Sequence, residues 1–245
     1  MNNVSGTLTL LQLLDEYDCH SFVFSSSATV YGCRNPMPLT EDATVIGTDI
    51  TNPYGKSKYM IEEILKDFYQ AKKDTDWRIV ILRYFNPVGA HPSGKIGEDP
   101  NGIPRNIMPY ICQVAIGRRD KLTVFGSDYA TKDGTGVRDF IHVCCLAEGH
   151  LSAMNYLKQR RGYYMFNLGT GIGISVMEMI EGMRRASGKE IPYVFGERRT
   201  GDISVMYANP EYAQRELQWK ATRDIDDMCR DSWNWQSSNP NGYGS

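Results

Sequence analysis

The chain has 245 residues, of which 41% are hydrophobic and 23% are charged, and its formal net charge is −2 at pH 7. Because the charges are balanced, neither a basic surface for nucleic acid nor an acidic tail is expected. No apolar run approaches the roughly 18 residues of a membrane-spanning helix, and the first residues lack the basic start and apolar core of a signal peptide. These features predict a cytoplasmic globular protein with no nucleic-acid partner and no membrane partner.

The cysteine pattern argues against structural cross-links. Six cysteines are scattered along the chain, without a C-x-x-C pair and without a histidine at ligand spacing. Such a distribution is typical of reduced thiols rather than of a disulfide framework or a zinc site. We therefore expect no bound metal.

The first part of the chain alternates helical and strand-like segments. Apolar residues at helical spacing predict a helix over residues 3–17, and the apolar run 22–24 predicts a buried strand that ends in three serines. Asn52 and Pro53 are the residue types of an N-cap and a first helical residue, and a second buried strand follows at 79–84. Helix, strand, helix and strand in this order predict an α/β fold with a parallel sheet.

The composition changes after Asn86. Residues 87–104 contain four prolines and four glycines, which indicates a long functional loop or a crossing between domains. We therefore predict two domains, at residues 1–86 and 87–245, and we consider a return of the strand near 164–168 to the first sheet. The other elements expected in this part are helices near 106–118, 143–158 and 175–186, strands at 122–125 and 193–194, and two short helices after them.

Tyr54 and Lys58 are the strongest chemical signal in the sequence. They lie four residues apart in the expected helix, so both side chains share one face. A phenol with a pKa of ~10 is a poor base at neutral pH, and a neighbouring ammonium favours the phenolate. The pair is therefore a candidate general base, although Y-x-x-x-K by itself also occurs by chance on surface helices.

The segments around this pair make the interpretation more specific. Together they resemble UDP-glucose 4-epimerases of the extended short-chain dehydrogenase/reductase superfamily, over nearly the whole chain. The resembling segments are SSSATVYG at 25–32, TNPYGKSK at 51–58, LRYFNPVGAH at 82–91, IGEDPNGIP at 96–104, DGTGVRDFIH at 133–142 and NLGTG at 167–171. The resemblance implies an incomplete Rossmann-type doubly wound parallel sheet, its second half only, followed by a smaller mixed α/β substrate-binding domain.

The same resemblance implies catalytic and cofactor-binding roles. Tyr54 is the expected base for the sugar O4, Lys58 is expected to bind the nicotinamide ribose and to favour the phenolate, and Ser27 is expected to bridge base and sugar. The residues implied to bind NAD are Asn2, Ser27, Tyr54, Lys58, Tyr84 and Phe85.

A larger set is implied to bind the substrates, UDP-galactose and UDP-glucose. Arg138 and Arg199 resemble a clamp for the diphosphate, a task that suits the planar fork of donors on a guanidinium. Residues 123–125 are expected beside the uracil. The implied substrate contacts are Ser27, Ala28, Thr29, Tyr84, Phe85, Asn86, Asn106, Ile107, Met108, Thr123, Val124, Phe125, Arg138, Arg199, Thr200, Gly201 and Asp202.

The front of a dinucleotide site is not found in this sequence. Such a site begins with a strand, a Gly-rich turn at a helix N-terminus and an acidic residue about 20 positions later. The glycines of 169–173 miss the G-x-G-x-x-G spacing because residue 174 is Ile. We therefore expect a truncated form of an enzyme that is a homodimer at full length, and no measurable epimerase activity from this chain alone.

Two alternatives to the epimerase interpretation stay open. A nucleotide-sugar 4,6-dehydratase of the same superfamily would need an acid and a base beside Ser27, whereas Ala28 and Thr29 stand there. A non-catalytic fragment or binding module is the second alternative, because the pyrophosphate loop is not found.

Met206 is expected to set the room around the sugar. The resemblance places it where the family varies side-chain size to admit or exclude an N-acetyl group. Methionine is unbranched and flexible, so it can fold aside at modest cost. We therefore expect weak acceptance of UDP-N-acetyl sugars, and the alternative is that Met206 only fills the core.

Overall fold

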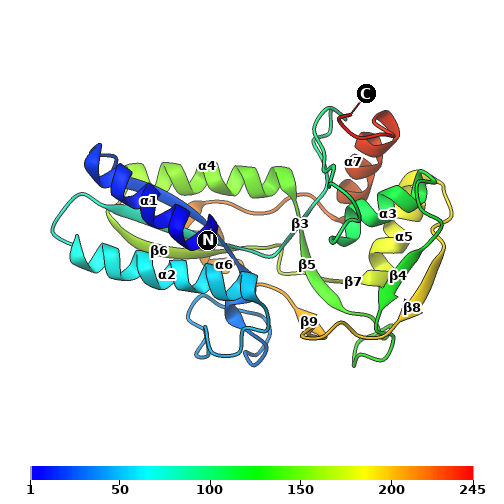
Figure 1. Cartoon of the computed structure of the whole chain (residues 1–245), viewed down its shortest axis with the longest axis horizontal. Coiled ribbons are helices and arrows are strands. Elements are labelled where there is room, and N and C mark those ends of the chain that lie inside the picture. Colours follow the sequence, from blue (N-terminus) through cyan, green and yellow to red (C-terminus); the bar gives the residue numbers. More distant parts are fainter. Residues whose placement is uncertain (1, 245) are drawn as a thin grey trace. The chain divides into compact units, whose positions relative to one another are not determined.

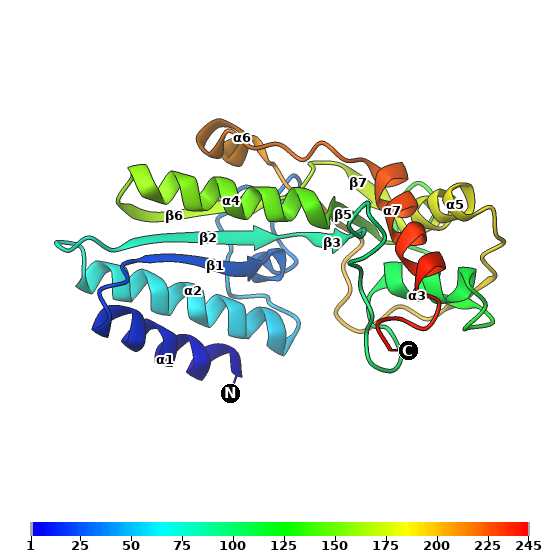
Figure 2. The same cartoon turned by 90° about the horizontal axis from the view of Figure 1, so that it is seen from above.

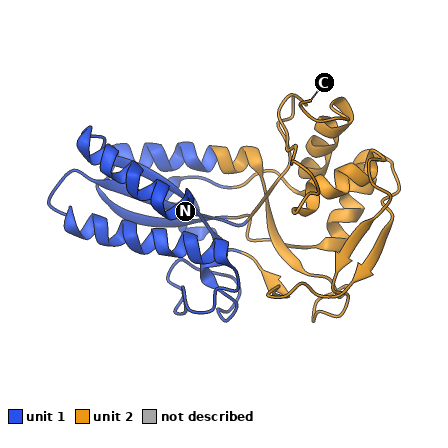
Figure 3. Cartoon of the chain, viewed as in Figure 1, with its two compact units in different colours: residues 1–85, 148–168, 208–220 blue, residues 86–147, 169–207, 221–245 orange. Residues whose placement is uncertain are grey.

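The structure is a computed structural model that describes residues 2–244. The chain forms two compact units (Figure 3). Unit 1 comprises residues 1–85, 148–168 and 208–220, and unit 2 comprises residues 86–147, 169–207 and 221–245. The assignment of a cofactor domain to residues 1–86 and a substrate domain to residues 87–245 stays a prediction.

Unit 1 is built on a three-stranded parallel sheet. Its strands lie in the order β1 (Ser21–Ser27), β2 (Arg78–Tyr84) and β6 (Gly162–Leu168). Helices α1 (Asn2–Glu16) and α2 (Pro53–Ala71) cover one face of this sheet, and α4 (Val143–Gln159) lies on the other (Figures 1 and 2). The predicted α/β fold with a parallel sheet is therefore confirmed.

The core of unit 1 follows from the apolar run of β2. Its residues Ile79–Leu82 are fully buried, as expected for a parallel strand that is covered on both faces. Leu65 of α2 and Trp77 before β2 are buried in the same unit. Complete burial of one such aliphatic side chain stabilises a fold by about 1.5–3 kcal/mol, so this layer is the main apolar contribution of the unit.

The start of α2 confirms the predicted cap. The Asn52 side chain accepts a hydrogen bond from Gly55 N at 2.7 Å, and Pro53 is the first helical residue. Such a cap satisfies one of the free N–H groups of the first turn and contributes about 0.5–2 kcal/mol. The cap fixes where α2 begins, and thereby where Tyr54 and Lys58 are placed.

Unit 2 contains two small sheets and three packed helices (Figure 1). Strand β5 (Val137–His142) pairs in parallel with β3 (Asn86–Val88) and β9 (Val205–Met206), and antiparallel with β7 (Gly173–Ser175). A second sheet joins β4 (Leu122–Phe125) and β8 (Tyr193–Gly196) in parallel. Helices α3 (Ile107–Ala115), α5 (Val176–Ser187) and α7 (Ile225–Ser238) pack around one apolar core.

The predicted elements are all present, and several further ones were not predicted. A one-turn 3₁₀ helix, η1 (Ala28–Tyr31), follows β1, and the short strands β3, β5, β7 and β9 pair only with distant segments. Strands of two to six residues carry little periodicity, which explains why they were missed. The last two helices were expected to be short; α6 (Glu211–Leu217) is, whereas α7 has 14 residues.

A buried ion pair links α2 to β2 inside unit 1. Arg83 Nη2 lies 2.7 Å from Glu62 Oε2, and the two side chains are 2% and 3% exposed. Ser26 Oγ of β1 donates to Glu62 Oε1 at 2.5 Å, and the guanidinium lies 4.7 Å from the ring centroid of Tyr31. We call Ser26, Glu62 and Arg83 the Arg83 cluster. Because each charge has a partner, the cluster fixes three elements in one register at little net cost.

Three further features concern membrane helices, thiols and metal ligands. Among residues 2–244, no helix is long and apolar enough to cross a membrane. All six cysteines are free thiols. No group of three or more His, Cys, Asp or Glu side chains within that range could hold a metal ion.

Removal of one partner of the buried pair should destabilise the chain strongly. We expect Glu62→Ala to lower the free energy of unfolding by about 3–5 kcal/mol, because Arg83 would stay buried without its counter-ion. The double variant Glu62→Leu with Arg83→Met should lose much less, since no unpaired charge remains. Urea unfolding followed by circular dichroism measures both losses. An equal loss in the single and double variants would contradict this account of the pair.

Candidate active site

The carboxyl ends of β1 and β2 carry polar side chains next to each other. In the parallel register, Ser25 lies opposite Leu82 and Ser27 lies opposite Tyr84. Parallel strands present their carboxyl ends at one edge of the sheet, which is where α/β proteins bind ligands. We call Ser25, Ser27, Tyr54, Lys58 and Tyr84 the strand-end group.

Tyr54 and Lys58 lie in the first turns of α2. Lys58 Nζ donates to the carbonyl oxygen of Ser25 at 2.6 Å and lies 5.7 Å from the ring centroid of Tyr54. Partial burial lowers the pKa of the Lys58 ammonium. Tyr54 itself is 52% exposed. The structure therefore presents a phenol at the surface with a fixed cationic neighbour, as the spacing of the two residues predicts.

Gly55 permits the close approach of α2 to η1. A Cβ atom at this position would lie 2.6 Å from Ile50 Cγ2 and 2.9 Å from Thr29 Oγ1, which is closer than real contacts allow. A glycine is therefore needed between Tyr54 and Lys56 for packing alone. This packing brings Thr29 next to the start of the helix that carries the tyrosine.

Ser27 ends β1 and caps η1. Its Oγ accepts hydrogen bonds from Thr29 N at 3.2 Å and from Thr29 Oγ1 at 2.9 Å. A hydroxyl has two acceptor sites and one proton, so these two bonds leave the Ser27 proton for another acceptor. Ala28 is buried, and its role as a substrate contact stays a prediction.

Tyr84 closes the strand-end group on the β2 side. Its hydroxyl donates to Ser25 Oγ at 2.6 Å and contacts Nε2 of His150 on α4. Burial raises the pKa of Tyr84; the hydrogen bond to Ser25 lowers this pKa and the nearby Tyr54 raises it. Tyr84 is therefore a hydrogen-bond donor at neutral pH, which leaves the half-exposed Tyr54 as the candidate base.

A cavity of about 900 Å³ in unit 2 contains most of the predicted substrate contacts. The predicted residues in its wall are Asn86, Asn106, Ile107, Thr123, Val124, Phe125, Arg138, Arg199 and Asp202. Thr200 and Gly201 are not among the residues of this wall, and Met108 is buried in the core of the unit. Substrate contacts by these three residues and by those of the wall stay predictions.

The cavity is suited to an anionic ligand. Arg138 Nη2 lies 3.4 Å from Asp202 Oδ1, and burial lowers the pKa of the Arg138 guanidinium, with Asp202 opposing that shift. The Arg199 guanidinium lies 4.1 Å from the ring centroid of Phe125. Two guanidinium groups and a partly exposed aromatic ring in one wall can hold a diphosphate and a flat base.

Several residues of the cavity wall were not predicted. Arg105 adds a third guanidinium, and the ring of Tyr129 adds a second aromatic face. The position of Arg105 directly before Asn106 could have identified it, whereas Tyr129 reaches the wall only through the loop before β5. The remaining unpredicted residues of the wall are Asn101, Ile103, Pro104, Tyr110, Leu122, Gly136, Phe140 and Val176.

Met206 lies next to an arginine of this cavity. In the pairing of β5 with β9, Arg138 and Met206 are direct partners. Met206 is 8% exposed. The register therefore places Met206, expected to limit the size of the sugar, on the strand next to Arg138, expected to bind the diphosphate.

The strand-end group fits the nicotinamide end of NAD. A lysine ammonium has three donors, and Lys58 gives one to Ser25, so two remain for ribose hydroxyls. Asn3, next to the predicted contact Asn2, donates to Ser57 Oγ at 3.0 Å, so α1 begins beside the turn of α2 that carries Lys58. Phe85 is buried directly after Tyr84. The predicted cofactor contacts therefore gather at one end of unit 1.

A family model described as GDP-mannose 4,6 dehydratase matches residues 1–232. Named relatives are more specific. The chain is 56% identical to UDP-glucose 4-epimerase 2 of Arabidopsis thaliana over 245 residues, which are 100% of this chain and 69% of that protein. It is 54% identical to UDP-glucose 4-epimerase of Bacillus subtilis, with 100% and 70% covered.

Solved structures show the same relationship. UDP-glucose 4-epimerase from Bifidobacterium longum, in complex with NAD⁺ and UDP, matches with a TM-score of 0.93 and 50% identity, over 99% of this chain and 71% of that chain. The enzyme from Stenotrophomonas maltophila, with bound NAD and formylated UDP-arabinopyranose, matches with a TM-score of 0.92 and 46% identity, over 97% and 69%. The chain therefore belongs to the family that the dehydratase model describes and, more narrowly, to the UDP-glucose 4-epimerases.

Proposed function

We propose that this protein interconverts UDP-galactose and UDP-glucose as an NAD-dependent isomerase. The observation that carries the proposal is the pairing of Tyr54 with Lys58 at the carboxyl end of a parallel sheet, with Lys58 Nζ 5.7 Å from the ring centroid of the tyrosine. The arginine-containing cavity of unit 2 supports a UDP-linked substrate. Family membership supports both assignments.

Tyr54 acts in this proposal as general base and then as general acid. Its phenolate takes the proton of the sugar O4 hydroxyl, and the phenol returns it when the opposite configuration forms. Lys58 favours the phenolate electrostatically, because its ammonium is held by the Ser25 carbonyl close to the ring. The Ser27 hydroxyl, whose proton neither bond from Thr29 uses, hydrogen-bonds between base and sugar oxygen.

NAD, when bound, supplies the redox capacity at the sugar C4. Lys58, Tyr84 and Phe85 would hold its nicotinamide end, and Asn2 would add a contact from the start of α1. Domain roles follow from these assignments. Residues 1–86 contribute cofactor binding and proton transfer, and residues 87–245 contribute UDP binding.

The cavity of unit 2 holds the nucleotide part of the substrate. Arg138 and Arg199 bind the diphosphate, with Arg105 as a further cation, and Phe125 packs against the uracil. An epimerase must let either face of the sugar C4 meet the cofactor, while the same base exchanges a proton with O4. Tight binding of the nucleotide, with few contacts to the hexose, lets the hexose turn within the site and satisfies that requirement.

The two alternatives differ from this proposal in testable ways. A 4,6-dehydratase needs an acid and a base next to Ser27, and Ala28 and Thr29 supply neither. A binding module without catalysis would bind UDP but give no product in a coupled assay.

We propose further that the enzyme works in the cytoplasm, which the six free thiols support, and that its active form is a homodimer. Exposed Leu8, Leu10 and Leu13 on α1 leave apolar surface for a second copy.

Replacement of the base should affect turnover far more than binding. In enzyme with a complete NAD site, we expect Tyr54→Phe to lower kcat by about 10²–10⁴-fold with KM for UDP-galactose nearly unchanged, because only the proton-transfer group is lost. A coupled assay of UDP-glucose formation measures both constants. Tyr17→Phe is the matched control, since Tyr17 is 75% exposed and lies outside the strand-end group. A Tyr54→Phe enzyme with normal kcat would rule out this base.

Arg138 should dominate diphosphate binding. We expect Arg138→Met to weaken UDP binding by about tenfold to a hundredfold, since a charged hydrogen bond contributes roughly 1.5–3 kcal/mol. Isothermal titration calorimetry with UDP on the 245-residue chain tests this without any turnover. Arg118→Met, at an exposed site outside the cavity wall, is the control. Equal affinities in the two variants would remove Arg138 from the clamp.

Met206 should limit the size of the sugar. In enzyme with a complete NAD site, we expect slow but detectable epimerisation of UDP-N-acetylgalactosamine with Met206 in place. We expect its loss in Met206→Tyr with UDP-galactose turnover retained, and its improvement in Met206→Cys. The measurement is kcat/KM for both substrates in the three proteins, with melting temperatures to detect overpacking by the tyrosine. If Met206→Tyr lowers kcat/KM equally for both substrates, the residue only fills the core.

A further inference from the structure

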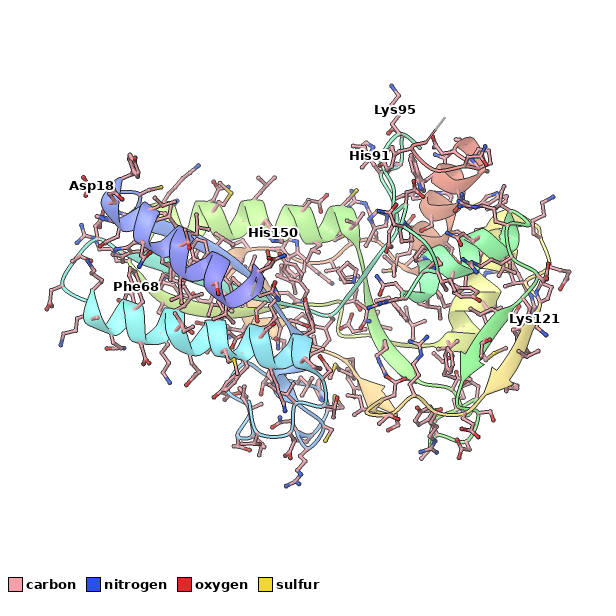
Figure 4. All side chains as sticks on the ribbon, viewed as in Figure 1. Asp18, Phe68, His91, Lys95, Lys121 and His150 are labelled. Atoms are coloured by element: carbon pink, nitrogen blue, oxygen red, sulfur yellow. The ribbon has the colours of Figure 1, made fainter. Side chains whose placement is uncertain are left out.

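His150 of α4 makes a contact for which the mechanism above has no role. Its Nε2 hydrogen-bonds to the hydroxyl of Tyr84, and the two rings meet edge to face, with centroids 5.2 Å apart at 67°. His150 lies on α4, on the opposite face of the sheet from α2 (Figures 2 and 4). The contact therefore reaches Tyr84 from the other side of the sheet than Lys58 and Tyr54.

The proton count at Tyr84 sets the direction of this hydrogen bond. A phenol has one proton, and Tyr84 donates it to Ser25 Oγ at 2.6 Å. With Tyr84 donating to Ser25, the proton between Tyr84 and His150 is assigned to the imidazole, so that Nε2–H donates to Tyr84 Oη. Bonds aligned in this way polarise one another and are stronger together than singly. His150, Tyr84 and Ser25 thus form one directed chain, which we call the His150 chain.

The His150 chain ends at the residue that holds the catalytic lysine. The carbonyl oxygen of Ser25 accepts the 2.6 Å hydrogen bond from Lys58 Nζ. Tyr84 also lies close enough to Tyr54 for a charge on Tyr54 to raise the pKa of Tyr84. One end of the chain therefore contacts the lysine beside the expected base, and one of its members, Tyr84, is itself expected to pack the nicotinamide.

We propose that His150 is a positioning residue of the epimerase reaction, whose Nε2–H orients Tyr84 and, through Ser25, the ammonium of Lys58 next to the base. This inference rests on the proposed function for its catalytic part. Its structural part, the protonated Nε2 and the directed hydrogen bonds, stands on the geometry of unit 1 alone.

Loss of the chain should reduce turnover rather than binding. Small misplacements of catalytic groups can cost about a hundredfold in rate. In enzyme with a complete NAD site, we therefore expect His150→Leu to lower kcat by about tenfold to a hundredfold with KM for UDP-galactose within about twofold. His150→Gln should recover most of kcat, because its amide N–H can donate at a similar reach. His20→Gln is the control, since His20 lies at the opposite end of β1, against Trp77. Equal kcat values in the Leu and Gln variants, or a change in KM alone, would overturn the proposal.

An NMR measurement tests the hydrogen-bond direction without any activity. Long-range ¹H–¹⁵N spectra of imidazole rings show which nitrogen carries the proton, and this chain has only four histidines. The His150 signals are identified by their disappearance in His150→Gln. At mildly alkaline pH we expect the proton on Nε2 in the wild-type chain and a shift of the Nε2–H signal in Tyr84→Phe, where its acceptor is lost. A proton on Nδ1 in the wild-type chain, or an unshifted Nε2–H signal in Tyr84→Phe, refutes the inference. If the Nε2 result holds while enzyme with a complete NAD site shows no epimerisation, the proposed function has failed rather than the His150 chain.

Discussion

The Arg83 cluster is the constraint on which the geometry of unit 1 depends. Glu62 lies one helical turn after Lys58 and two turns after Tyr54, so all three share a face of α2. The Glu62 carboxylate accepts hydrogen bonds from Ser26 Oγ of β1 and from the guanidinium of Arg83 of β2. A helix tied to two strands by one buried carboxylate cannot slide along them without leaving a charge unpaired. The cluster therefore fixes the position of α2 along β1 at which Lys58 reaches the carbonyl oxygen of Ser25.

The sequence predicted those parts of the site that depend on local rules. The spacing of Tyr54 and Lys58, the cap at Asn52 and the serines at the end of a buried strand each follow from a few adjacent residues. The acceptor of Lys58 and the partner of Tyr84 could not be predicted, because each depends on how separate strands and helices pack. His150 is 66 residues from Tyr84 in sequence, and nothing near it in the sequence indicates the contact.

The same distinction applies to unit 2. The arginines of the cavity were predicted by resemblance, but the pairing of Arg138 with Met206 across β5 and β9 is a property of register. Asp139, the neighbour of Arg138, is fully buried and accepts three hydrogen bonds from Thr170 and Gly171. The glycine-containing turn at Gly169–Gly173, which resembles a dinucleotide loop, thus has a structural task within unit 2. A buried carboxylate satisfied by that turn holds β5, and with it Arg138, in place.

The fixed and exposed side chains around Tyr54 suit a reaction that interconverts the two configurations of the sugar C4. Two hydrogen bonds to Ser25, one from Lys58 and one from Tyr84, fix side chains that surround Tyr54. Tyr54 itself is half exposed. This exposure leaves Tyr54, the proposed base, accessible to a sugar hydroxyl in either configuration. A 4,6-dehydratase needs an acid and a base next to Ser27, and Ala28 and Thr29 do not provide them. Tyr54 is therefore accessible to a substrate, while the buried Arg83 cluster fixes the helix on which it lies.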